Sequence, residues 1–421
     1  MGISLNSGAR AVGSIDRASE CDGVPSYNFY SERSWVEGRA KEQLVELSSM
    51  EGVQQMAAFP DLHPGKFGPV GVALLADRVY PQLIGNDIGC GMSLFALDVE
   101  VRKLKLEKCA EKLRVLEGPY LNDGPDGLHE INTHLEESNL HGLAKGQDLF
   151  LQSLGTIGGG NHFCELQAIE DVFEVAQLDQ LKLDKNCALL FVHSGSRGFG
   201  MSVFQTVQHC FAEGLRLDRS EFEAYMTLHD AAVCWASLNR RLIAKRAADA
   251  LRAKLRLIAD NAHNLIEQSG DQFLHRKGAA KADLPLVPLA GSRDALSYLL
   301  KPTEDIKLQN RSLFSLAHGS GRKYDRKSMK GRVGRNKSNL QKLERTSFGG
   351  RVVCEDKQLL VEEAPSAYKS SKTVLADLVD ANLATPLLSL KPLLTFKKAQ
   401  LHSKANLKKR IKPSRNRRHS R

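Results

Sequence analysis

An aspartate and a cysteine lie three residues apart in a glycine-rich stretch, Gly85-Asn-Asp87-Ile-Gly-Cys90-Gly91-Met92. Glycines let the backbone bend tightly, so the Asp87 carboxylate and the Cys90 thiol can face one centre. A hard oxygen beside a soft sulfur suits a divalent transition ion such as Mn, Zn or Fe better than Mg. The pair alone also fits a simpler interpretation, in which Asp87 caps a turn and Cys90 is a packed small residue.

Four of the thirteen histidines are set apart by the glycine, amide or arginine residues beside them: His162, His193, His263 and His318. The first follows three consecutive glycines, 158–160, whose backbone N–H groups could cradle phosphate oxygens. That run is weak evidence alone, because the chain has no GxxxxGK[ST] phosphate loop. The second histidine shares a Gly/Ser loop with Arg197, and the fourth precedes Arg322 and Arg326.

One aspartate, one cysteine and three histidines would complete the ligand set of one or two divalent ions. A fourth histidine, beside two arginines, is then left for covalent or acid–base chemistry. The combination predicts a metal-dependent enzyme that acts on phosphates.

Hydrophobic spacing predicts the elements that must position these residues. Short apolar runs broken by glycine and proline indicate strands, at 70–76, 93–99, 163–167 and 188–192. Helical spacing predicts helices, at 34–49, 102–117 and 220–269, the last of which contains His263. Segment 118–148, rich in Asn, Asp, Gly, His and Glu, is expected to be exposed and irregular. The absence of a regular βαβ rhythm favours an α+β fold over a doubly wound sheet. We expect one large domain, residues 1–397, and a basic, disordered C-terminal tail, residues 398–421.

The charge of the chain is unevenly distributed. The 421 residues hold 59 Lys and Arg and 49 Asp and Glu, a formal net charge of +10, which indicates an anionic partner such as nucleic acid. Residues 397–421 hold eleven basic residues and no acid, and residues 322–345 hold ten basic residues and two acids. The remaining body is net acidic.

Several classes of protein are excluded by composition. No run of about eighteen apolar residues exists, which argues against a transmembrane helix. The N-terminus has neither the apolar core of a signal peptide nor a myristoylation motif, so the cytoplasm is the expected location. The eight cysteines form no Cys-x-x-Cys pair, so neither a disulfide framework nor a zinc finger is indicated.

From about Gly52 to Lys397, the sequence resembles the RtcB family of RNA-splicing ligases. The matching motifs are Phe59-Pro-Asp-Leu-His-Pro-Gly-Lys66, Asp87-Ile-Gly-Cys-Gly-Met92, 158–165, His193-Ser-Gly-Ser-Arg197, His263-Asn264, His275-Arg-Lys-Gly-Ala279, 318–322 and Glu363-Ala-Pro-Ser-Ala-Tyr368. The first motif and the departures described below look closest to the subgroup often encoded beside a release-factor-like protein.

The resemblance implies a GTP- and Mn-dependent RNA ligase that joins 3′-phosphate or 2′,3′-cyclic phosphate ends to 5′-OH ends in RNA repair or splicing. His318 would attack the α-phosphate of GTP, pass GMP to the RNA 3′-phosphate, and the 5′-OH would then displace it. A cyclic phosphate would first be opened by hydrolysis. Two Mn ions would be held by Asp87, Cys90, His162, His193 and His263, with Cys90 as the bridging thiolate.

The same resemblance implies further roles. Arg197, Arg322 and Arg326 would grip RNA phosphates, and Asp61 would orient the incoming 5′-OH. Glu165 would accept hydrogen bonds from guanine N1 and N2. The full set of implied guanylate contacts is Asn161, His162, Phe163, Cys164, Glu165, His263, Asn264, Ala290, Gly291, Ser292, Arg293, Ser297, His318, Gly319, Ser320, Gly321 and Lys397.

The chain departs from the family pattern near the expected nucleotide site. Ala290-Gly-Ser-Arg-Asp294 replaces the usual Pro-Gly-Ser-Met-Gly, which introduces charge there and puts the pocket geometry in doubt. Ser320 replaces Ala, Asn86 replaces Val, and 24 residues follow Lys397 where the family normally has one. Because all five implied ligands and the implied nucleophile are present, we predict retained catalysis with an altered RNA preference.

Two other functions remain open at this point. One is a metal-dependent phosphodiesterase or cyclic phosphatase that never ligates. The other is a non-catalytic RNA-binding or ribosome-associated factor dominated by the basic tail, which a chain ending after Lys398 would test. A lysine-nucleotidyl ligase is disfavoured because the chain has no Lys-x-Asp-Gly motif. Expected partners are RNA and either an archease-like activator or a release-factor-like protein, with no membrane.

Overall fold

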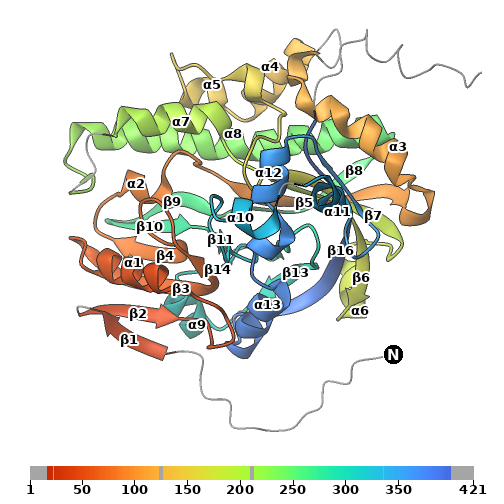
Figure 1. The fold of residues 1–421 in the computed structure, drawn as a ribbon. Helices are drawn as coiled ribbons and strands as arrows, with labels where there is room; N and C mark the ends of the chain where they lie inside the picture. The colour runs from red at the N-terminus through yellow and green to blue at the C-terminus, as the bar shows by residue number, and fades with distance from the viewer. Residues whose placement is uncertain (1–16, 22, 123–126, 209–212, 335, 400–421) are drawn as a thin grey trace, which may run out of the picture.

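The computed structural model describes residues 17–21, 23–122, 127–208, 213–334 and 336–399. Within them the chain forms a single α+β domain, as predicted, built around two mixed sheets (Figure 1). The predicted tail lies outside the described residues from residue 400 onward. Among the described helices, none is both long and apolar enough to cross a membrane.

The smaller of the two sheets has six strands in the order β1-β2-β3-β4-β10-β9. β2 and β3 are parallel, and the other neighbours are antiparallel. The strands are β1 (Arg17–Cys21), β2 (Val24–Asn28), β3 (Val53–His63), β4 (Val70–Ala76), β9 (Asn264–Ser269) and β10 (Gln272–Lys277).

The larger sheet has the order β12-β13-β16-β6-β7-β5-β8, with β15 paired in parallel to β16. Its strands are β5 (Gly91–Glu100), β6 (Phe163–Val172), β7 (Cys187–Ser194), β8 (Leu255–Ala262), β12 (Val287–Leu289), β13 (Ser297–Pro302), β15 (Arg351–Cys354) and β16 (Ala384–Lys398). A two-stranded ladder joins β11 (Ala279–Lys281) to β14 (Ser315–Ala317). The predicted strands all lie within β4, β5, β6 and β7.

The long helix α8 (Ser220–Leu251) packs against β5, β7 and β8 of the larger sheet (Figure 1). The prediction that it continues to residue 269 is wrong. Arg252 adopts a left-handed conformation with φ 61°, which ends the helix, and the chain then turns into β8 and β9. Leu255 and Ile258, which continue the helical spacing in the sequence, therefore lie in a strand. His263 sits between two strands that belong to different sheets.

The expectation of an irregular segment at 118–148 is also wrong. It contains α4 (Gly127–Glu137) and α5 (Leu140–Leu143), which lie on the outer side of α8 in Figure 1. Ile131, Leu135 and Leu140 are completely buried in one cluster with Trp235 of α8. The few apolar residues of the segment fall on one face, so its polar composition concealed an amphipathic helix.

The predicted helices at 34–49 and 102–117 correspond to α1 (Gly38–Ser48) and to α3 (Leu106–Lys112) with 3₁₀ turns on either side. The remaining helices are α2 (Pro81–Ile84), α6 (Val175–Gln180), α7 (Arg197–Thr206), α9 (Ile306–Arg311), α10 (Met329–Val333), α11 (Lys337–Leu343), α12 (Lys357–Glu362) and α13 (Ser371–Asp380).

Candidate metal centre and nucleotide pocket

A cavity of about 800 Å³ lies where strands of both sheets begin or end. Cys90 directly precedes β5, and His193 lies near the end of β7. In the antiparallel ladders, Met92 is opposite His193, and Gly91 is opposite Ala262, the residue before His263. The backbone N–H of His263 also donates to the Cys90 carbonyl at 2.8 Å. Strand register therefore brings three of the predicted ligands together.

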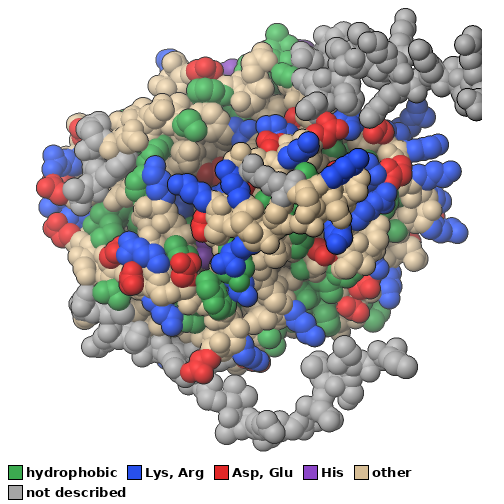
Figure 2. All heavy atoms as spheres, viewed as in Figure 1, with side chains coloured by type: hydrophobic (Ala, Val, Ile, Leu, Met, Phe, Trp, Pro, Cys, Tyr) green, Lys and Arg blue, Asp and Glu red, His purple; other side chains and the backbone are tan. Residues whose placement is uncertain are grey.

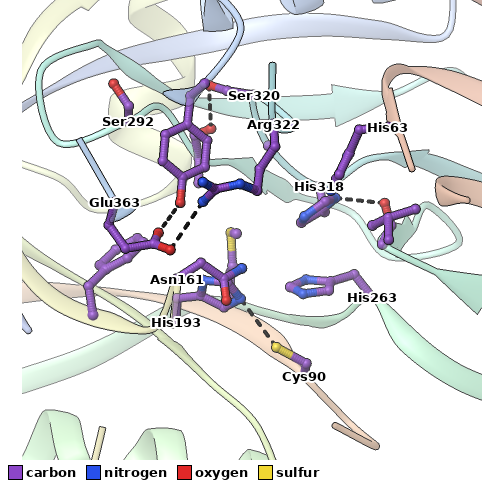
Figure 3. Close-up of a pocket in the computed structure, with 18 of the residues that line it drawn as sticks. His63, Cys90, Asn161, His193, His263, Ser292, His318, Ser320, Arg322 and Glu363 are labelled. Atoms are coloured by element: carbon purple, nitrogen blue, oxygen red, sulfur yellow. Dashed lines mark hydrogen bonds and ion pairs between the residues drawn. The ribbon is translucent and has the colours of Figure 1, made fainter. Parts of the chain in front are cut away.

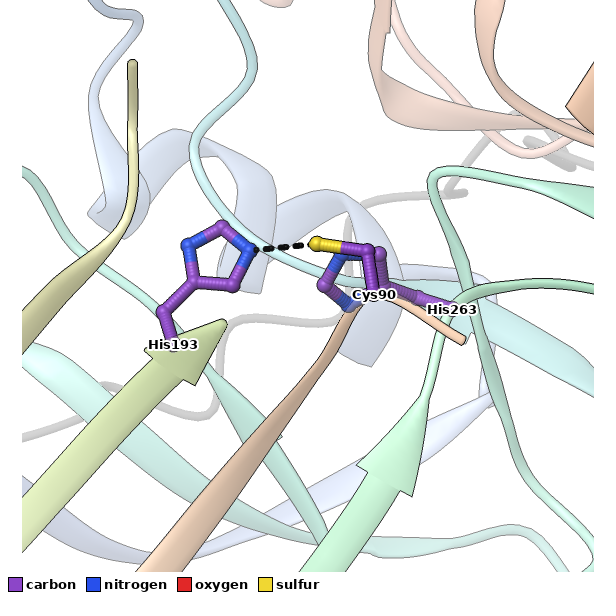
Figure 4. A group of neighbouring side chains, drawn as sticks. All are labelled: Cys90, His193 and His263. Atoms are coloured by element: carbon purple, nitrogen blue, oxygen red, sulfur yellow. Dashed lines mark hydrogen bonds between the residues drawn. The ribbon is translucent and has the colours of Figure 1, made fainter. Parts of the chain in front are cut away.

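All five predicted metal ligands meet in two overlapping groups. Cys90, His193 and His263 form one group, and Asp87, Cys90 and His162 form the other, with the ligand atoms of each group within 4.8 Å of one another. The Cys90 Sγ lies 3.2 Å from His193 Nε2 (Figure 4). It also lies 3.4 Å from His162 Nε2. Each group could hold one divalent ion, and Cys90 is common to both.

Burial sets the protonation of these groups. Desolvation lowers the pKa of His193 and that of His263 well below the usual value, which favours neutral rings with a lone pair for a metal ion. Burial and the nearby Asp87 carboxylate raise the pKa of the Cys90 thiol well above normal, so a bound cation is needed to ionise it. Burial alone would raise the pKa of Asp87, but His162 outweighs it and lowers that pKa.

The loop that carries Asp87 and Cys90 is tied to α8 by a buried arginine. Arg240 donates to the backbone carbonyls of Gly89 (2.8 Å) and Ser194 (3.2 Å), next to two of the ligands, and pairs with Asp260 at 2.8 Å. Gly195 is required by close approach, because a Cβ there would lie 2.1 Å from the Asp87 carboxylate. The ligands are thus positioned by rigid elements rather than by loops alone.

His318 lies in the loop after β14, with its ring centroid 4.5 Å from that of His263 (Figure 3). Its Nδ1 is 2.6 Å from the Asp61 carboxylate and 2.6 Å from the Gly278 carbonyl. The Asp61 carboxylate also accepts from the His318 backbone N–H at 3.2 Å. Nδ1 therefore carries the proton, and Nε2 is left as the atom with an available lone pair.

Asp61 is completely buried and does not line the cavity, and its carboxylate contacts His318. Its expected contact with the incoming 5′-OH stays a prediction. Gly321 supports this arrangement, because its φ of 67° is left-handed and a Cβ there would lie 2.1 Å from the Asp61 carbonyl.

Most of the expected guanylate contacts line the cavity, but His162, Cys164 and Ser297 do not. Cys164 is completely buried in the core on the other face of β6, whereas Phe163 and Glu165 face the cavity, because side chains alternate along a strand. Ser297 instead accepts from the Gly291 backbone N–H at 3.0 Å. A direct nucleotide contact is therefore not supported for the Cys164 or Ser297 side chain.

Glu165 and Lys397 lie at the buried end of the cavity. The Glu165 carboxylate accepts from Gln167 at 2.6 Å and from the Thr395 hydroxyl, and burial raises its pKa. Lys397 donates to the His162 carbonyl at 2.8 Å, and burial lowers the pKa of its amine. Both side chains line the cavity.

The unusual Arg293 and Asp294 are both engaged by protein groups. The buried Arg293 guanidinium donates to the carbonyls of Leu360 (3.0 Å) and Glu363 (2.9 Å) at the C-terminus of α12. Asp294 accepts from the backbone and side chain of Ser347, both at 2.7 Å. The charge introduced by this departure stabilises the end of a helix, which is a favourable place for a cation.

The three predicted arginines have different environments. Arg322 and Arg326 line the cavity. Arg322 donates to the Glu363 carboxylate at 3.1 Å (Figure 3), and so does Arg326, also at 3.1 Å. Arg197 does not line the cavity. It lies at the start of α7 with φ 55° and a buried Nε that has no partner, and a Cβ on Gly158 would meet its guanidinium at 2.0 Å.

Sequence reasoning assigned no role to several other groups that line the cavity, among them His63, Lys277, Glu363 and Tyr368. The buried Glu363 accepts from both arginines and from the Tyr368 hydroxyl. Burial alone would raise the pKa of Glu363, but Lys397, Arg326 and Arg322 lower it to about 2. All four residues stand in the motifs that carry the family resemblance, which was the available signal.

The comparisons with known proteins agree with this geometry. The family model described as "tRNA-splicing ligase RtcB" matches residues 43–150 and 129–398. The chain belongs to the RtcB family. A family member from Escherichia coli, named RNA-splicing ligase RtcB2, is 41% identical over 377 residues, which cover 88% of this chain and 95% of that protein. The tRNA-splicing ligase RtcB of Archaeoglobus fulgidus is 26% identical over 88% of this chain and 94% of its own length. The residues that the family model matches include all of the motifs that carry the resemblance.

Proposed function

We propose that this RtcB family member is a GTP- and Mn-dependent RNA ligase that joins 3′-phosphate or 2′,3′-cyclic phosphate ends to 5′-OH ends through a guanylylated His318. The observation that carries the proposal is the fixed orientation of His318. Its Nδ1 faces Asp61 and Gly278, and its ring lies next to that of His263 of the five-ligand cluster, with the two rings tilted by 42°. A nucleophilic nitrogen and a dinuclear ligand set thus share one cavity.

The donor set fits two divalent ions. A thiol, three imidazoles and a carboxylate offer the mixture of soft, intermediate and hard donors that Mn accepts, and Cys90 belongs to both groups. Bound there, the ions would withdraw charge from the phosphate oxygens and keep Cys90 ionised. Asp87, His162, His193 and His263 would supply the remaining ligands.

In the first step, His318 Nε2 attacks the α-phosphorus of GTP, a P–N bond forms, and pyrophosphate leaves. The Nδ1–H keeps donating to the Asp61 carboxylate and the Gly278 carbonyl, so the carboxylate stabilises the positive charge that develops on the ring. We assign Asp61 this positioning role in place of the contact with the 5′-OH. Glu165 and Lys397 bind the guanylate.

In the later steps, an oxygen of the RNA 3′-phosphate attacks the guanylylated histidine, the P–N bond breaks, and the RNA carries GMP. The 5′-OH of the second RNA then attacks the 3′-phosphorus, and GMP leaves as the phosphodiester forms. A 2′,3′-cyclic phosphate is hydrolysed to the 3′-phosphate beforehand. Arg322 and Arg326 hold the RNA phosphates near His318. An altered RNA preference, and a release-factor-like or archease-like partner, remain predictions from the sequence.

Incubation with Mn²⁺, GTP labelled in the α-phosphate, and an RNA pair with 3′-phosphate and 5′-OH ends tests the proposal. We expect acid-labile label on the protein and joined RNA. His318→Ala should abolish both, whereas the matched control His129→Ala, an exposed histidine of α4, should retain both. Wild-type protein that takes up no label from GTP and only hydrolyses the RNA ends would contradict the proposal and identify a phosphodiesterase.

A further inference from the structure

A partly exposed aromatic and cationic cluster lies beside the cavity and takes no part in the proposed chemistry. It consists of Trp35, Lys323, Tyr324 and Arg332, and we call it the Trp35 platform. The rings of Trp35 and Tyr324 have centroids 6.1 Å apart and are tilted by 56°. The Arg332 guanidinium lies 3.6 Å from the centre of the Tyr324 ring, and the Lys323 amine lies 5.4 Å from it.

Trp35 is 42% exposed but is held in a fixed position. It lies in the segment between β2 and α1, where the neighbouring Ser34 hydroxyl donates to the buried Asp377 carboxylate at 2.6 Å. Arg33 also pairs with Asp377, at 3.1 Å. A single exposed apolar residue is ordinary on a protein surface, but an indole fixed beside a second ring and two cations is a preformed binding surface.

Tyr324 connects the Trp35 platform to the cavity. Its ring packs on the small core around Met329 and Ala367, and its backbone carbonyl accepts from Arg322 Nε at 3.0 Å. Arg322 lines the cavity, as do Arg326 and Lys327 further along the same segment. A nucleic-acid strand whose terminal phosphate meets Arg322 would therefore leave the cavity past Tyr324.

The charge of this segment identifies the class of partner. Residues 322–345 hold ten basic residues and two acids, and Figure 2 shows Lys and Arg side chains gathered over the region of α10 and α11. Cations that neutralise phosphates, interleaved with aromatic rings on which bases stack, are the features that bind single-stranded nucleic acid. A partner protein with an acidic or apolar surface would not require two neighbouring aromatic rings for its binding.

We propose that the Trp35 platform stacks an unpaired base of the RNA strand that leaves the cavity, with Lys323 and Arg332 contacting its phosphates. The inference rests on the proposed function only for the identity of the substrate as RNA. It adds a specificity-determining surface, because base stacking favours ends that are single-stranded for at least a few nucleotides.

Intrinsic fluorescence tests the stacking on the full chain. The chain has two tryptophans, and Trp235 is completely buried, so quenching by an added 3′-phosphorylated single-stranded RNA reports on Trp35. We expect quenching in the wild type and its loss in Trp35→Phe. Trp35→Ala should raise the Kd for this RNA about tenfold, the scale of one stacked base, and Trp35→Phe should restore most of the affinity. The KM for RNA should rise in Trp35→Ala far more than kcat falls.

Phe173→Ala is the matched control, because Phe173 is 48% exposed and lies at the end of β6 rather than beside α10. Its RNA affinity should equal that of the wild type. Unquenched wild-type fluorescence, or an unchanged RNA Kd in Trp35→Ala, would overturn the platform, and so would an equal loss of affinity in Phe173→Ala. Labelling of wild-type protein by GTP without RNA reads out the proposed function separately, so the two failures are distinguishable.

Discussion

His318 and Asp61 form a pair in which each residue constrains the other. The buried carboxylate accepts from both the ring Nδ1 and the backbone N–H of His318, so it fixes the ring orientation and the tautomer. Asparagine at position 61 would keep the size but remove the negative charge that stabilises a positive ring. We therefore expect Asp61→Asn to slow labelling of His318 by GTP about a hundredfold or more.

The rate of label incorporation at saturating GTP measures this effect. Asp271→Asn is the control, because Asp271 is exposed in the turn between β9 and β10 and should label at the wild-type rate. If Asp61 instead contacted only the incoming 5′-OH, Asp61→Asn would label normally and fail only in the final joining step. That outcome would restore the role first expected from the family resemblance.

The lowered pKa of Glu363 predicts that the free energy of unfolding falls as the pH is lowered. Its pKa is about 2 in the folded protein against an ordinary 4.5, so its contribution to the free energy of unfolding is complete above pH 4.5 and is lost as the pH falls toward 2. The difference corresponds to at most about 3 kcal/mol. Glu363→Gln should therefore lose stability at pH 7 and show a shallower decline between pH 4.5 and 3.

Urea unfolding at pH 7, 4.5 and 3 measures the difference between wild type and Glu363→Gln. Glu136→Gln, which changes an exposed carboxylate of α4, should follow the wild-type curve at each pH. Parallel curves for Glu363→Gln and the wild type would show that the three cations around Glu363 do not lower its pKa.

At the scale of single residues, the sequence predicted which residues carry the chemistry but not which side chains contact one another. The sequence set apart Asp87, Cys90 and the four histidines, because the glycine, amide and arginine residues beside them are not typical of a packed core. Asp61 and Glu363 could not be assigned their partners, because each contacts residues far away in the chain, at 318 for the first and 322–326 for the second. Such pairs depend on tertiary packing that no local pattern encodes.

Strands, rather than loops, set the separation between the metal ligands. β5 lies between β7 and β8, so Cys90 at its start has His193 on one side and His263 on the other. Asp87 and His162 approach Cys90 from the turn before β5 and the loop before β6. The element arrangement therefore predicts two sites that share one ligand and can be removed separately.

Metal analysis after equilibrium dialysis against Mn²⁺ tests this arrangement. We expect two ions per wild-type chain, corresponding to the two ligand groups. His263→Ala should lose one ion and Cys90→Ala should lose both, because only Cys90 belongs to both groups. Cys234→Ala, at an exposed position of α8, should bind as the wild type does. Equal loss of both ions in His263→Ala would contradict separate sites.

Elements were predictable where the hydrophobic period was clear and the ends were marked. β4 and β5 were recognised from short apolar runs next to glycine or proline. α8 was recognised but extended too far, because Leu255 and Ile258 continue its spacing while Arg252, an unmarked residue, ends it in a left-handed conformation. α4 was missed because a mostly polar composition outweighed its few buried positions.

The α4 helix provides a direct test of this correction. Leu135→Ala should lower the free energy of unfolding by about 2–5 kcal/mol, because Leu135 is completely buried against the α8 cluster. Leu128→Ala, in the first turn of α4 at a residue that is 54% exposed, should change it by less than about 0.5 kcal/mol. Urea unfolding of both variants measures the contrast. Equal, small effects would mean that α4 does not pack on α8.

On the scale of the whole molecule, the basic charge and the chemistry are separated. The metal ligands and His318 lie in a net-acidic body between the two sheets, and the basic residues concentrate in 322–345, beside the cavity, and after Lys397. Lys397 itself is buried in the pocket, and Ala399 donates its N–H to Glu117 at 2.6 Å. The described contacts of the domain therefore extend to Ala399, two residues beyond its expected end at residue 397.

A chain that ends after Ala399 keeps every residue of the cavity and loses nine Lys and Arg residues. We expect its labelling by GTP to match the wild type, because Lys397 and the contact to Glu117 remain. Its affinity for RNA should fall, and the slope of log K against log salt should become shallower by about 0.7 for each phosphate that the tail contacts. A full-length variant with the nine basic residues changed to Gln is the matched control, and it should reproduce the shallower slope if charge is the cause. An unchanged slope in both variants would assign RNA binding to residues 322–345 and the Trp35 platform alone, whereas loss of labelling would place the tail in the active site.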